Sequence, residues 1–356
     1  MAELFTPLQI KSITFKNRLV VSPMCQYSSL DGFSGEWHMV HLGSRAIGGA
    51  ALVFTEATAI TPEGRISPSD LGIWKDEHIE HLKRITTFIE SHGSVPGIQI
   101  AHAGRKSSQD APWKGSKTIS IDEGGWETIA PSSIAFKEGE PVPRELSKEE
   151  IKQLVRKFEE AAGRALKAGF KVLELHGAHG YLIHEFLSPL SNTRKDDYGG
   201  SYENRIRFLK EIIVAVRKVW PTELPLFVRL STTEYAEGGW TEQDSIKLAK
   251  IIKKMDVDLL DCSSGGNVHG VKITLKPLYQ TDLAEIVRKA SGIKTGAVGL
   301  ITTAREAESI IADNRADLVF MAREFLRDPY FPLRAAQELG EDVDWPDQYV
   351  RAKRKN

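Results

Sequence analysis

Two histidines and a tyrosine lie together in the segment Glu174 to Leu182. His176 and His179 are three positions apart, and Tyr181 follows them. The apolar run Val172 to Leu175 precedes them, so they are expected where a strand opens into a loop. Neutral imidazoles and a phenol suit a substrate oxygen that gains negative charge, with a proton donor beside it. Two alternatives share this pattern: a metal-binding pair, or two histidines with a structural role.

The composition is that of a globular protein, with 356 residues of which 41% are hydrophobic and 27% charged. A net charge of −1 gives no global field for recruiting nucleic acid or an anionic membrane. Residues 1–7 lack the basic and apolar regions of an export signal. The longest nearly apolar stretch, Ile47 to Phe54, is shorter than the about 18 residues of a membrane span. We therefore expect a cytoplasmic protein whose partner is a small molecule.

Cys25 and Cys262 are the only two cysteines. Two cysteines cannot build a disulfide framework or a cysteine-ligated iron–sulfur cluster, which also indicates a reducing compartment. Cys262 stands in an apolar run and is expected to be a small core residue.

Short apolar runs alternate with segments of helical periodicity along the chain. The predicted strands are Arg18–Ser22, Ala51–Thr55, Gly97–Ala101, Val172–His176, Leu226–Leu230, Leu259–Ser263, Thr295–Val298 and Leu318–Met321. The predicted helices are Ile151–Ala168, Ile206–Val219, Thr241–Met255, Leu283–Ala290 and Thr303–Ala312. Ser147 with Glu150 forms a capping-box pattern before the first of these helices, and Gly169 ends it.

Eight strands alternating with helices predict an α/β protein, a single (β/α)₈ TIM barrel that takes up residues 1–356 as one domain. A doubly wound open sheet is the alternative, but no G-x-G-x-x-G motif follows an early strand. Lys11 to Asn17 predicts a short N-terminal hairpin over the barrel floor. Gly104 to Arg144 predicts a long loop after the third strand, and loops of that length are typically lids or binding loops.

In a TIM barrel the chemistry lies at the C-terminal ends of the strands. In strand order, these positions hold Ser22-Pro23-Met24-Cys25-Gln26-Tyr27, Glu56-Ala57, Gln99 with His102, the His176–Tyr181 cluster, Arg229, Ser263-Ser264-Gly265-Gly266, Gly299 and Ala322-Arg323. The last two strands thus end in a glycine turn and an arginine, the usual place of a phosphate in this fold.

Arg229 ends an otherwise apolar strand and would be nearly buried without an anionic partner. The alternative is an ion pair with a barrel glutamate, Glu56 or Glu174. Gln99 offers both a donor and an acceptor to the edge of a heterocycle. A phosphate site, an amide, a buried cation and a cysteine at one barrel mouth favour a phosphorylated, redox-active heterocycle, and FMN fits best.

A metal hydrolase is the competing class, because His176 and His179 could ligate zinc. A third ligand with suitable spacing is hard to name, so the sequence predicts no metal.

Four segments in colinear order resemble the Old Yellow Enzyme family of FMN-dependent ene reductases. They are Ser22–Tyr27, Gln99–Lys106, His176–Tyr181 and Ser188–Asn192. The likeness is greatest to the thermophilic-like bacterial subgroup, which includes xenobiotic reductases, and it runs from about Leu8 to Arg351.

The resemblance implies roles for individual residues. Those expected to contact FMN are Ser22, Pro23, Met24, Cys25, Ala57, Gln99, Arg229, Ala322 and Arg323. Tyr27, His176 and His179 would face the substrate, Tyr181 would donate a proton, and Cys25 would tune the flavin. Two half-reactions are implied: NADPH or NADH reduces the flavin, and an α,β-unsaturated carbonyl or nitro compound then accepts hydride at its C=C bond.

Two features depart from the family pattern, namely Ala322 and the end of the C-terminal tail. Ala322 replaces a frequent glycine before the phosphate-site arginine, which is tolerable if its φ is negative. Gln348 to Ala352 resembles the segment that sends an arginine into a neighbouring subunit's site, so Arg351 is expected to bind substrate across a homodimer or homotetramer interface. The tail Lys353–Asn356 lacks the tryptophan of some members, and a solvated basic tail is the alternative.

Two rival functions remain. Dienoyl-CoA reductases, which are related flavin barrels, need an iron–sulfur cluster and extra domains that two cysteines and this length exclude. A non-catalytic flavin or phosphate-ligand binder would leave the histidine pair and Tyr181 unexplained.

Overall fold

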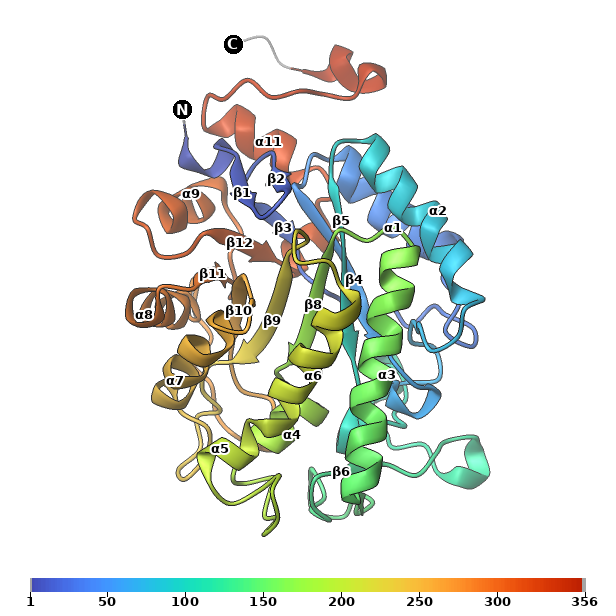
Figure 1. Cartoon of the computed structure of the whole chain (residues 1–356). Coiled ribbons are helices and arrows are strands. Elements are labelled where there is room, and N and C mark those ends of the chain that lie inside the picture. Colours follow the sequence, from blue (N-terminus) through green and yellow to red (C-terminus); the bar gives the residue numbers. More distant parts are fainter. Residues whose placement is uncertain (1, 354–356) are drawn as a thin grey trace.

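A closed barrel of eight parallel strands forms the centre of the computed structural model, which describes residues 2–353 (Figure 1). The strands follow one another around the barrel in chain order, and the last pairs with the first. They are β3 (Leu19–Val21), β4 (Leu52–Ala59), β5 (Val95–Ala101), β8 (Val172–Gly177), β9 (Leu226–Ser231), β10 (Leu259–Ser263), β11 (Lys294–Ala297) and β12 (Leu318–Met321). The predicted (β/α)₈ barrel and its eight strands are confirmed.

The largest boundary error concerns β4, which runs four residues past the predicted end at Thr55. Its pairing with β5 shifts register between Phe54 and Ala57, so a bulge lies inside the strand. A bulge re-aims the residues that follow it. The polar pair Thr55-Glu56 resembles the end of a strand, which explains the early end of the prediction.

The N-terminal hairpin covers the barrel floor, as predicted, but it starts earlier than Lys11. Strands β1 (Leu8–Ile10) and β2 (Ile13–Phe15) pair antiparallel around a turn at Lys11. Ile10 and Phe15 pack into one apolar cluster with the barrel-interior rings of Phe54, Phe227 and Phe320. The prediction missed the residues before Lys11 because strands of three residues are too short to show a period of two.

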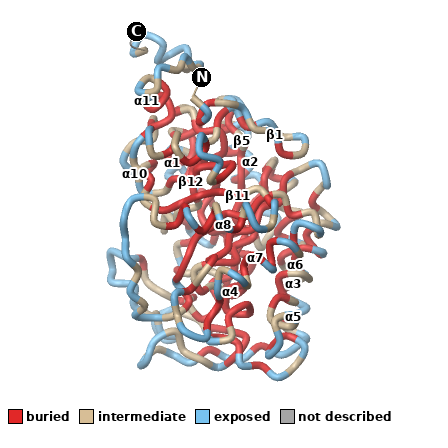
Figure 2. Tube along the Cα trace, turned by 90° about the vertical axis from the view of Figure 1, so that its left-hand side faces the viewer, coloured by how far each residue is buried: buried red, intermediate tan, exposed pale blue. Residues whose placement is uncertain are grey.

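Eleven α-helices follow or flank the strands within the described residues, and the long ones form a layer outside the barrel (Figure 1). They are α1 (Glu36–Ile47), α2 (His78–Ser91), α3 (Lys148–Lys167), α4 (Leu182–Leu187), α5 (Tyr202–Arg205), α6 (Arg207–Val219), α7 (Glu242–Lys253), α8 (Thr281–Ser291), α9 (Ala304–Ala312), α10 (Arg323–Arg327) and α11 (Phe331–Glu338). Figure 2 shows the buried trace running through the strands and the inner sides of these helices.

All five predicted helices are present as α3, α6, α7, α8 and α9. The capping box of α3 is confirmed, since Glu150 Oε2 accepts from Ser147 N at 2.8 Å while the Ser147 side chain accepts from Glu150 N. Gly169, with φ 88°, ends that helix. Helix α1 was not predicted because it buries His38 and His41 along with Leu42, which breaks the apolar pattern.

The stretch 104–144 is a long loop, as predicted, with only short 3-10 turns and the two-residue strand β6 (Ile129–Ala130), which pairs with β7 (Arg144–Glu145). Trp126 connects the loop to the segment after β4, because its indole N–H donates to Glu63 O at 2.8 Å. The guanidinium of Arg65 lies 4.9 Å from the Trp126 ring and 5.3 Å from the Trp74 ring. Arg65 thus links Trp126 of this loop to Trp74, which precedes α2, through cation–π contacts.

The C-terminal 3-10 helix η6 (Asp347–Ala352) extends beyond α11, at the end of the molecule where the N-terminal hairpin lies (Figure 1). Residues 354–356 of the predicted basic tail lie outside the described part of the chain. No helix within residues 2–353 has both the length and the apolar character needed to cross a membrane. That residues 1–356 form one domain stays a prediction.

Candidate active site

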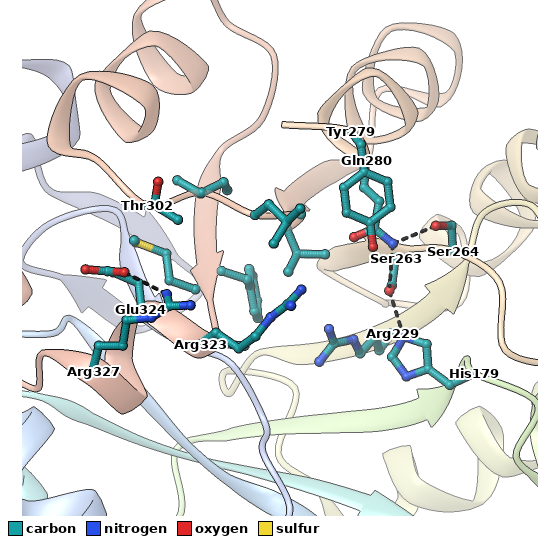
Figure 3. Close-up of a pocket in the computed structure, with 17 residues that line it drawn as sticks. His179, Arg229, Ser263, Ser264, Tyr279, Gln280, Thr302, Arg323, Glu324 and Arg327 are labelled. Carbon is teal, nitrogen blue, oxygen red and sulfur yellow. Dashed lines mark hydrogen bonds and ion pairs between the residues drawn. The ribbon is translucent and has the colours of Figure 1, made fainter. Parts of the chain in front are cut away.

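A cavity of about 290 Å³ opens where β9 to β12 end (Figure 3). Five residues to which the sequence analysis assigned a role line it, namely His179, Arg229, Gly299, Ala322 and Arg323. Arg229 and Arg323 come from different strand ends and point toward the same space in Figure 3. The barrel therefore brings together the positions at which the sequence placed a cofactor.

Arg229 is buried and has two polar partners. Its Nη1 donates to Ser22 Oγ at 3.1 Å, which joins the ends of β3 and β9. Its Nε lies 3.2 Å from Asp261 Oδ2. The expectation that Arg229 lacks an anionic partner is thus wrong: it forms an ion pair with a barrel carboxylate, that of Asp261 rather than of Glu56 or Glu174. The reason is register: Asp261 of β10 lies directly beside Arg229 of β9 in the sheet.

Asp261 and Glu174 are buried carboxyl groups on the strands that flank β9. Burial raises the pKa of Asp261 to about 6 against the lowering effect of Arg229, and burial raises the pKa of Glu174 well above its ordinary value. Gln99 Nε2 donates to Glu174 Oε1 at 2.8 Å, which leaves the Gln99 carbonyl oxygen for another partner. Sequence reasoning missed Asp261, although an acid inside the apolar run Leu259–Cys262 is a usable signal.

The histidine pair and Tyr181 form one cluster. The ring centroid of His176 lies 5.2 Å from that of His179 and 5.0 Å from that of Tyr181. His176 Nδ1 accepts from Ala178 N at 3.4 Å, so a neutral ring holds its proton on Nε2. Burial, and next the charge of Arg229, lower the pKa of both histidines well below the ordinary value. Both are therefore neutral hydrogen-bond donors near pH 7.

Ser263 and Gln280 extend this cluster. His179 Nε2 lies 2.7 Å from Ser263 Oγ, and Gln280 Nε2 donates to Ser264 Oγ at 2.6 Å (Figure 3). Gln280 and Tyr279 line the cavity and were not predicted. They lie in the loop between β10 and α8, where an amide and a tyrosine give no local signal of function.

Tyr181 adopts an extended conformation immediately before α4. Burial raises the pKa of its phenol well above the ordinary value. The phenol therefore keeps its proton at neutral pH and can act as a proton donor.

Cys25 and Tyr27 follow β3 on a segment that a buried pair fixes. Gln26 N donates to Glu56 Oε2 at 3.2 Å, and the other Glu56 oxygen lies 3.0 Å from His38 Nε2. Burial, and then Asp70 and Glu56, raise the pKa of Cys25, so its side chain is a thiol. Tyr27 has a left-handed φ of 51°, a conformation that tends to occur at functional sites.

Pro23 and Met24 lie half-buried between Ser22 and Cys25, and Ala57 pairs with Gln99 across β4 and β5. Cys262 is fully buried in the main apolar core, as predicted.

The ends of β11 and β12 fit a phosphate. Gly299 has φ 122°, and a Cβ there would meet Gln280 backbone and side-chain atoms at 3.0–3.1 Å. Ala322 has φ −107°, so the alanine is tolerated as expected. No carboxylate within residues 2–353 forms an ion pair with Arg323, whose side chain points into the cavity. A cation without an acidic partner suits an anionic group. The glycine beside it carries no side chain, so such a group can approach the backbone closely.

One predicted site residue, Arg351, lies apart from this cavity. Arg351 is exposed on η6 and does not line it, so one chain alone does not bring this residue to the site. The metal-hydrolase alternative requires a third ligand beside the two histidines. No group of three or more His, Cys, Asp or Glu side chains that could hold a metal ion is found in the described residues.

Residues 3–342 match the NADH:flavin oxidoreductase / NADH oxidase family. The chain is 49% identical over 353 residues to an NADPH dehydrogenase of Geobacillus sp., covering 99% of this chain and 98% of the relative. It is 50% identical over 352 residues to an NADPH dehydrogenase of Bacillus velezensis, covering 98% and 99% of the two chains.

Solved structures agree. Morphinone reductase superposes with a TM-score of 0.80 at 29% identity, over 97% of this chain and 91% of that one. A 2-naphthoyl-CoA reductase gives 0.85 at 28% identity over 95% of this chain, which spans only 52% of that longer protein. The match over nearly the whole chain shows that this protein belongs to the NADH:flavin oxidoreductase / NADH oxidase family, the Old Yellow Enzymes.

Proposed function

We propose that this FMN-dependent oxidoreductase is an ene reductase that takes hydride from NADPH or NADH and reduces the activated C=C bond of an α,β-unsaturated carbonyl or nitro compound. One observation carries the proposal: two neutral histidines and a protonated tyrosine meet beside the cavity that holds Arg229 and Arg323. The names of relatives support it, since NADPH dehydrogenases and morphinone reductase are among them.

The residues at the strand ends fit FMN. Gly299, Ala322 and Arg323 would hold the phosphate. Ser22, Pro23, Met24, Cys25, Ala57, Gln99 and Arg229 would contact the rest of the group. When bound, FMN supplies two-electron hydride chemistry, accepting hydride from the nicotinamide and passing it to the substrate.

The protein's own groups supply orientation, charge and a proton. His176 and His179 donate hydrogen bonds to the substrate's carbonyl or nitro oxygen, which draws electron density from the C=C bond. Arg229 provides fixed positive charge in a buried place. Tyr181 then delivers the phenol proton to the α-carbon. Tyr27, whose ring centroid lies 5.4 Å from that of Trp113 in an edge-to-face contact, would form the outer wall for the substrate.

Arg351 contributes from a neighbouring subunit under this proposal. Helix η6, which carries Arg351, lies at the end of the molecule where the N-terminal hairpin lies, away from the strand ends that form the site (Figure 1). Arg351 would therefore serve a second copy's site in a homodimer or homotetramer. A guanidinium delivered in this way would clamp the substrate or nicotinamide. A cytoplasmic location remains part of the proposal.

The test is anaerobic stopped-flow spectroscopy of the purified holoenzyme. We expect NADPH to bleach the flavin band in a first mixing, and 2-cyclohexenone to restore it in a second mixing without oxygen. A flavin that NADPH bleaches but no enone or nitroalkene restores contradicts ene reduction. A flavin that NADPH and NADH both leave oxidised indicates a non-catalytic flavin binder.

A further inference from the structure

The side chain of Lys106 ties together two loops of the site. Its ammonium donates to His179 O at 2.8 Å and to Gly266 O at 3.0 Å. His179 belongs to the loop after β8, and Gly266 to the loop after β10. Lys106 itself lies in the short 3-10 turn that follows β5. One cation thus bridges loops from three different strands.

The two bridged loops touch backbone to backbone. A Cβ at Gly266 would lie 2.7 Å from His179 Cα, and a Cβ at Gly180 would overlap Gly266 O. Both glycines also have left-handed φ values, 74° for Gly180 and 89° for Gly266. A side chain at either position would not fit, so this close contact requires both glycines.

His179 itself is strained. Its φ is 60°, in the left-handed region that non-glycine residues rarely adopt. Its N–H donates to Ser231 Oγ at 2.9 Å, and Ser231 Oγ donates to Gly265 O at 2.8 Å. The Lys106 ammonium donates a hydrogen bond to the carbonyl oxygen of the same residue, His179. The backbone of a proposed oxyanion donor is therefore held at both polar atoms.

The same ammonium lies over the face of Tyr181, 5.1 Å from the ring centroid, and 4.6 Å from that of Phe136. Cation–π attraction fixes a ring against the cation. Lys106 thus contacts the proposed proton donor while it holds the backbone of the oxyanion donor.

We infer that Lys106 is a positioning residue, whose positive charge sets the left-handed turn of His179 and the ring of Tyr181 in one arrangement. Neither the histidine pair nor the tyrosine could keep that geometry from its own loop alone. The inference rests on the proposed ene reduction and adds a residue that does not itself touch the reacting atoms.

Burial is the main reason that the pKa of Lys106 falls to about 8, with Arg105 lowering it further and Glu185 and Glu140 raising it. The other titratable groups that feel this charge are His176, His179 and His184. All three have pKa values below the ordinary one and stay neutral at pH 7 and above. Glu185 is different, because burial raises its pKa to about 8, in the same range as Lys106.

The experiment compares the wild-type holoenzyme with Lys106→Met, Lys106→Arg and a control, Lys157→Met. Lys157 is a half-exposed residue of α3 that pairs with Glu160 at 3.0 Å. The first readout is binding of p-hydroxybenzaldehyde to the oxidised enzyme at pH 6.5, followed by the flavin spectrum. Lys106→Met should bind it about tenfold more weakly or worse, since a charge-assisted hydrogen bond is lost. Lys106→Arg should recover part of this loss, and Lys157→Met should match the wild type.

The second readout is the rate at which 2-cyclohexenone reoxidises dithionite-reduced enzyme between pH 6.5 and 9.5. Lys106 is charged below about pH 8, so the wild-type rate should fall as the pH rises through that value. Arginine stays charged over the whole range, so Lys106→Arg should lose the fall. A fall that persists in Lys106→Arg assigns it to Glu185 and overturns the inference. Reduction by NADPH should change less than about threefold in each variant.

Equal affinity of the wild type and Lys106→Met for the phenol also overturns the inference, whether or not enones are reduced. If Lys106→Met fails to fold, the wild type and Lys106→Arg still decide through the pH profile. Failure of ene reduction is recognised separately, because the wild type would then leave cyclohexenone unreacted while the phenol titration still reports on Lys106.

Discussion

His179 Nε2 and Ser263 Oγ lie 2.7 Å apart, although His179 follows β8 and Ser263 is the last residue of β10. The Ser263 hydroxyl accepts in turn from Gln280 Nε2 at 3.3 Å, so the loop that follows β10 orients the imidazole of His179 through this serine. An oriented neutral imidazole can turn one N–H toward a substrate oxygen without paying for reorganisation.

His176→Ala or His179→Ala should weaken binding of phenolic ligands and slow the oxidative half-reaction. Loss of a donor aimed at a developing oxyanion typically costs about 3 kcal/mol, or about a hundredfold in rate. Stopped-flow measurement of each half-reaction checks this, and reduction by NADPH should change far less. Ser263→Ala is the matched control, because it frees the His179 ring without removing it and should have a smaller effect. Loss of bound zinc that tracks activity in the histidine variants would favour the hydrolase alternative.

The purified protein should be yellow and carry FMN rather than FAD. Gly299, Ala322 and Arg323 line one place suited to a phosphate, and residues 2–353 show no dinucleotide loop after an early strand. Chromatography of the cofactor released by heat identifies it. FAD in the supernatant, or colourless protein, would contradict the prediction.

Cys25→Ala should shift the flavin reduction potential while the fold stays intact. The expected reason is that a partly buried thiol beside the flavin changes the polarity of its surroundings. A redox titration against a reference dye measures the potential. Cys262→Ala is the control: it removes a fully buried core sulfur, so it should lower the stability by about 1 kcal/mol and leave the potential unchanged. Equal potentials for the wild type and Cys25→Ala, with equal kinetics, would return Cys25 to a packing role.

Deleting Tyr349 to Asn356 should raise KM more than it lowers kcat and should change the oligomeric state. Tyr349 anchors the segment, since its ring centroid lies 5.8 Å from that of Tyr330, whereas Arg351 is exposed. Steady-state kinetics and light scattering of the truncated protein test both parts. Arg351→Ala separates them, because it should raise KM and leave the oligomer unchanged. Wild-type kinetics and mass after truncation would identify the segment as a solvated tail.

The free energy of unfolding should fall as the pH rises from about 4 to about 7 because of Asp70. Burial, and next Glu56, raise the pKa of this carboxyl from 3.8 to about 7. Between these values the folded state binds more protons than the unfolded state, so raising the pH favours unfolding. Urea unfolding of the wild type and Asp70→Asn at pH 4.5 and 7.5 measures the effect. The stability of the wild type relative to the variant should decrease over this range, and a constant difference would show that Asp70 is not the cause.

Much of this protein could be predicted from local patterns. The eight apolar runs became the eight barrel strands because parallel strands are buried on both faces and so need continuous apolar residues. The capping box at Ser147 and Glu150 depends on residues three positions apart, and it formed as expected. Helix α1 was not predicted from the sequence, because two of the residues on its buried face are histidines.

The site divides in the same way. Its chemical members, His176, His179, Tyr181 and Arg229, were identifiable from residue type and from their place at strand ends. Their partners were not: Asp261 beside Arg229, Ser263 beside His179 and Lys106 over Tyr181 all come from other strands or loops. The sequence alone determined which groups are available, because strand periodicity and residue chemistry are local. Only the closed barrel decided which groups meet, because register and loop contact join residues that are far apart in the chain, such as Ser22 and Arg229, which are 207 positions apart.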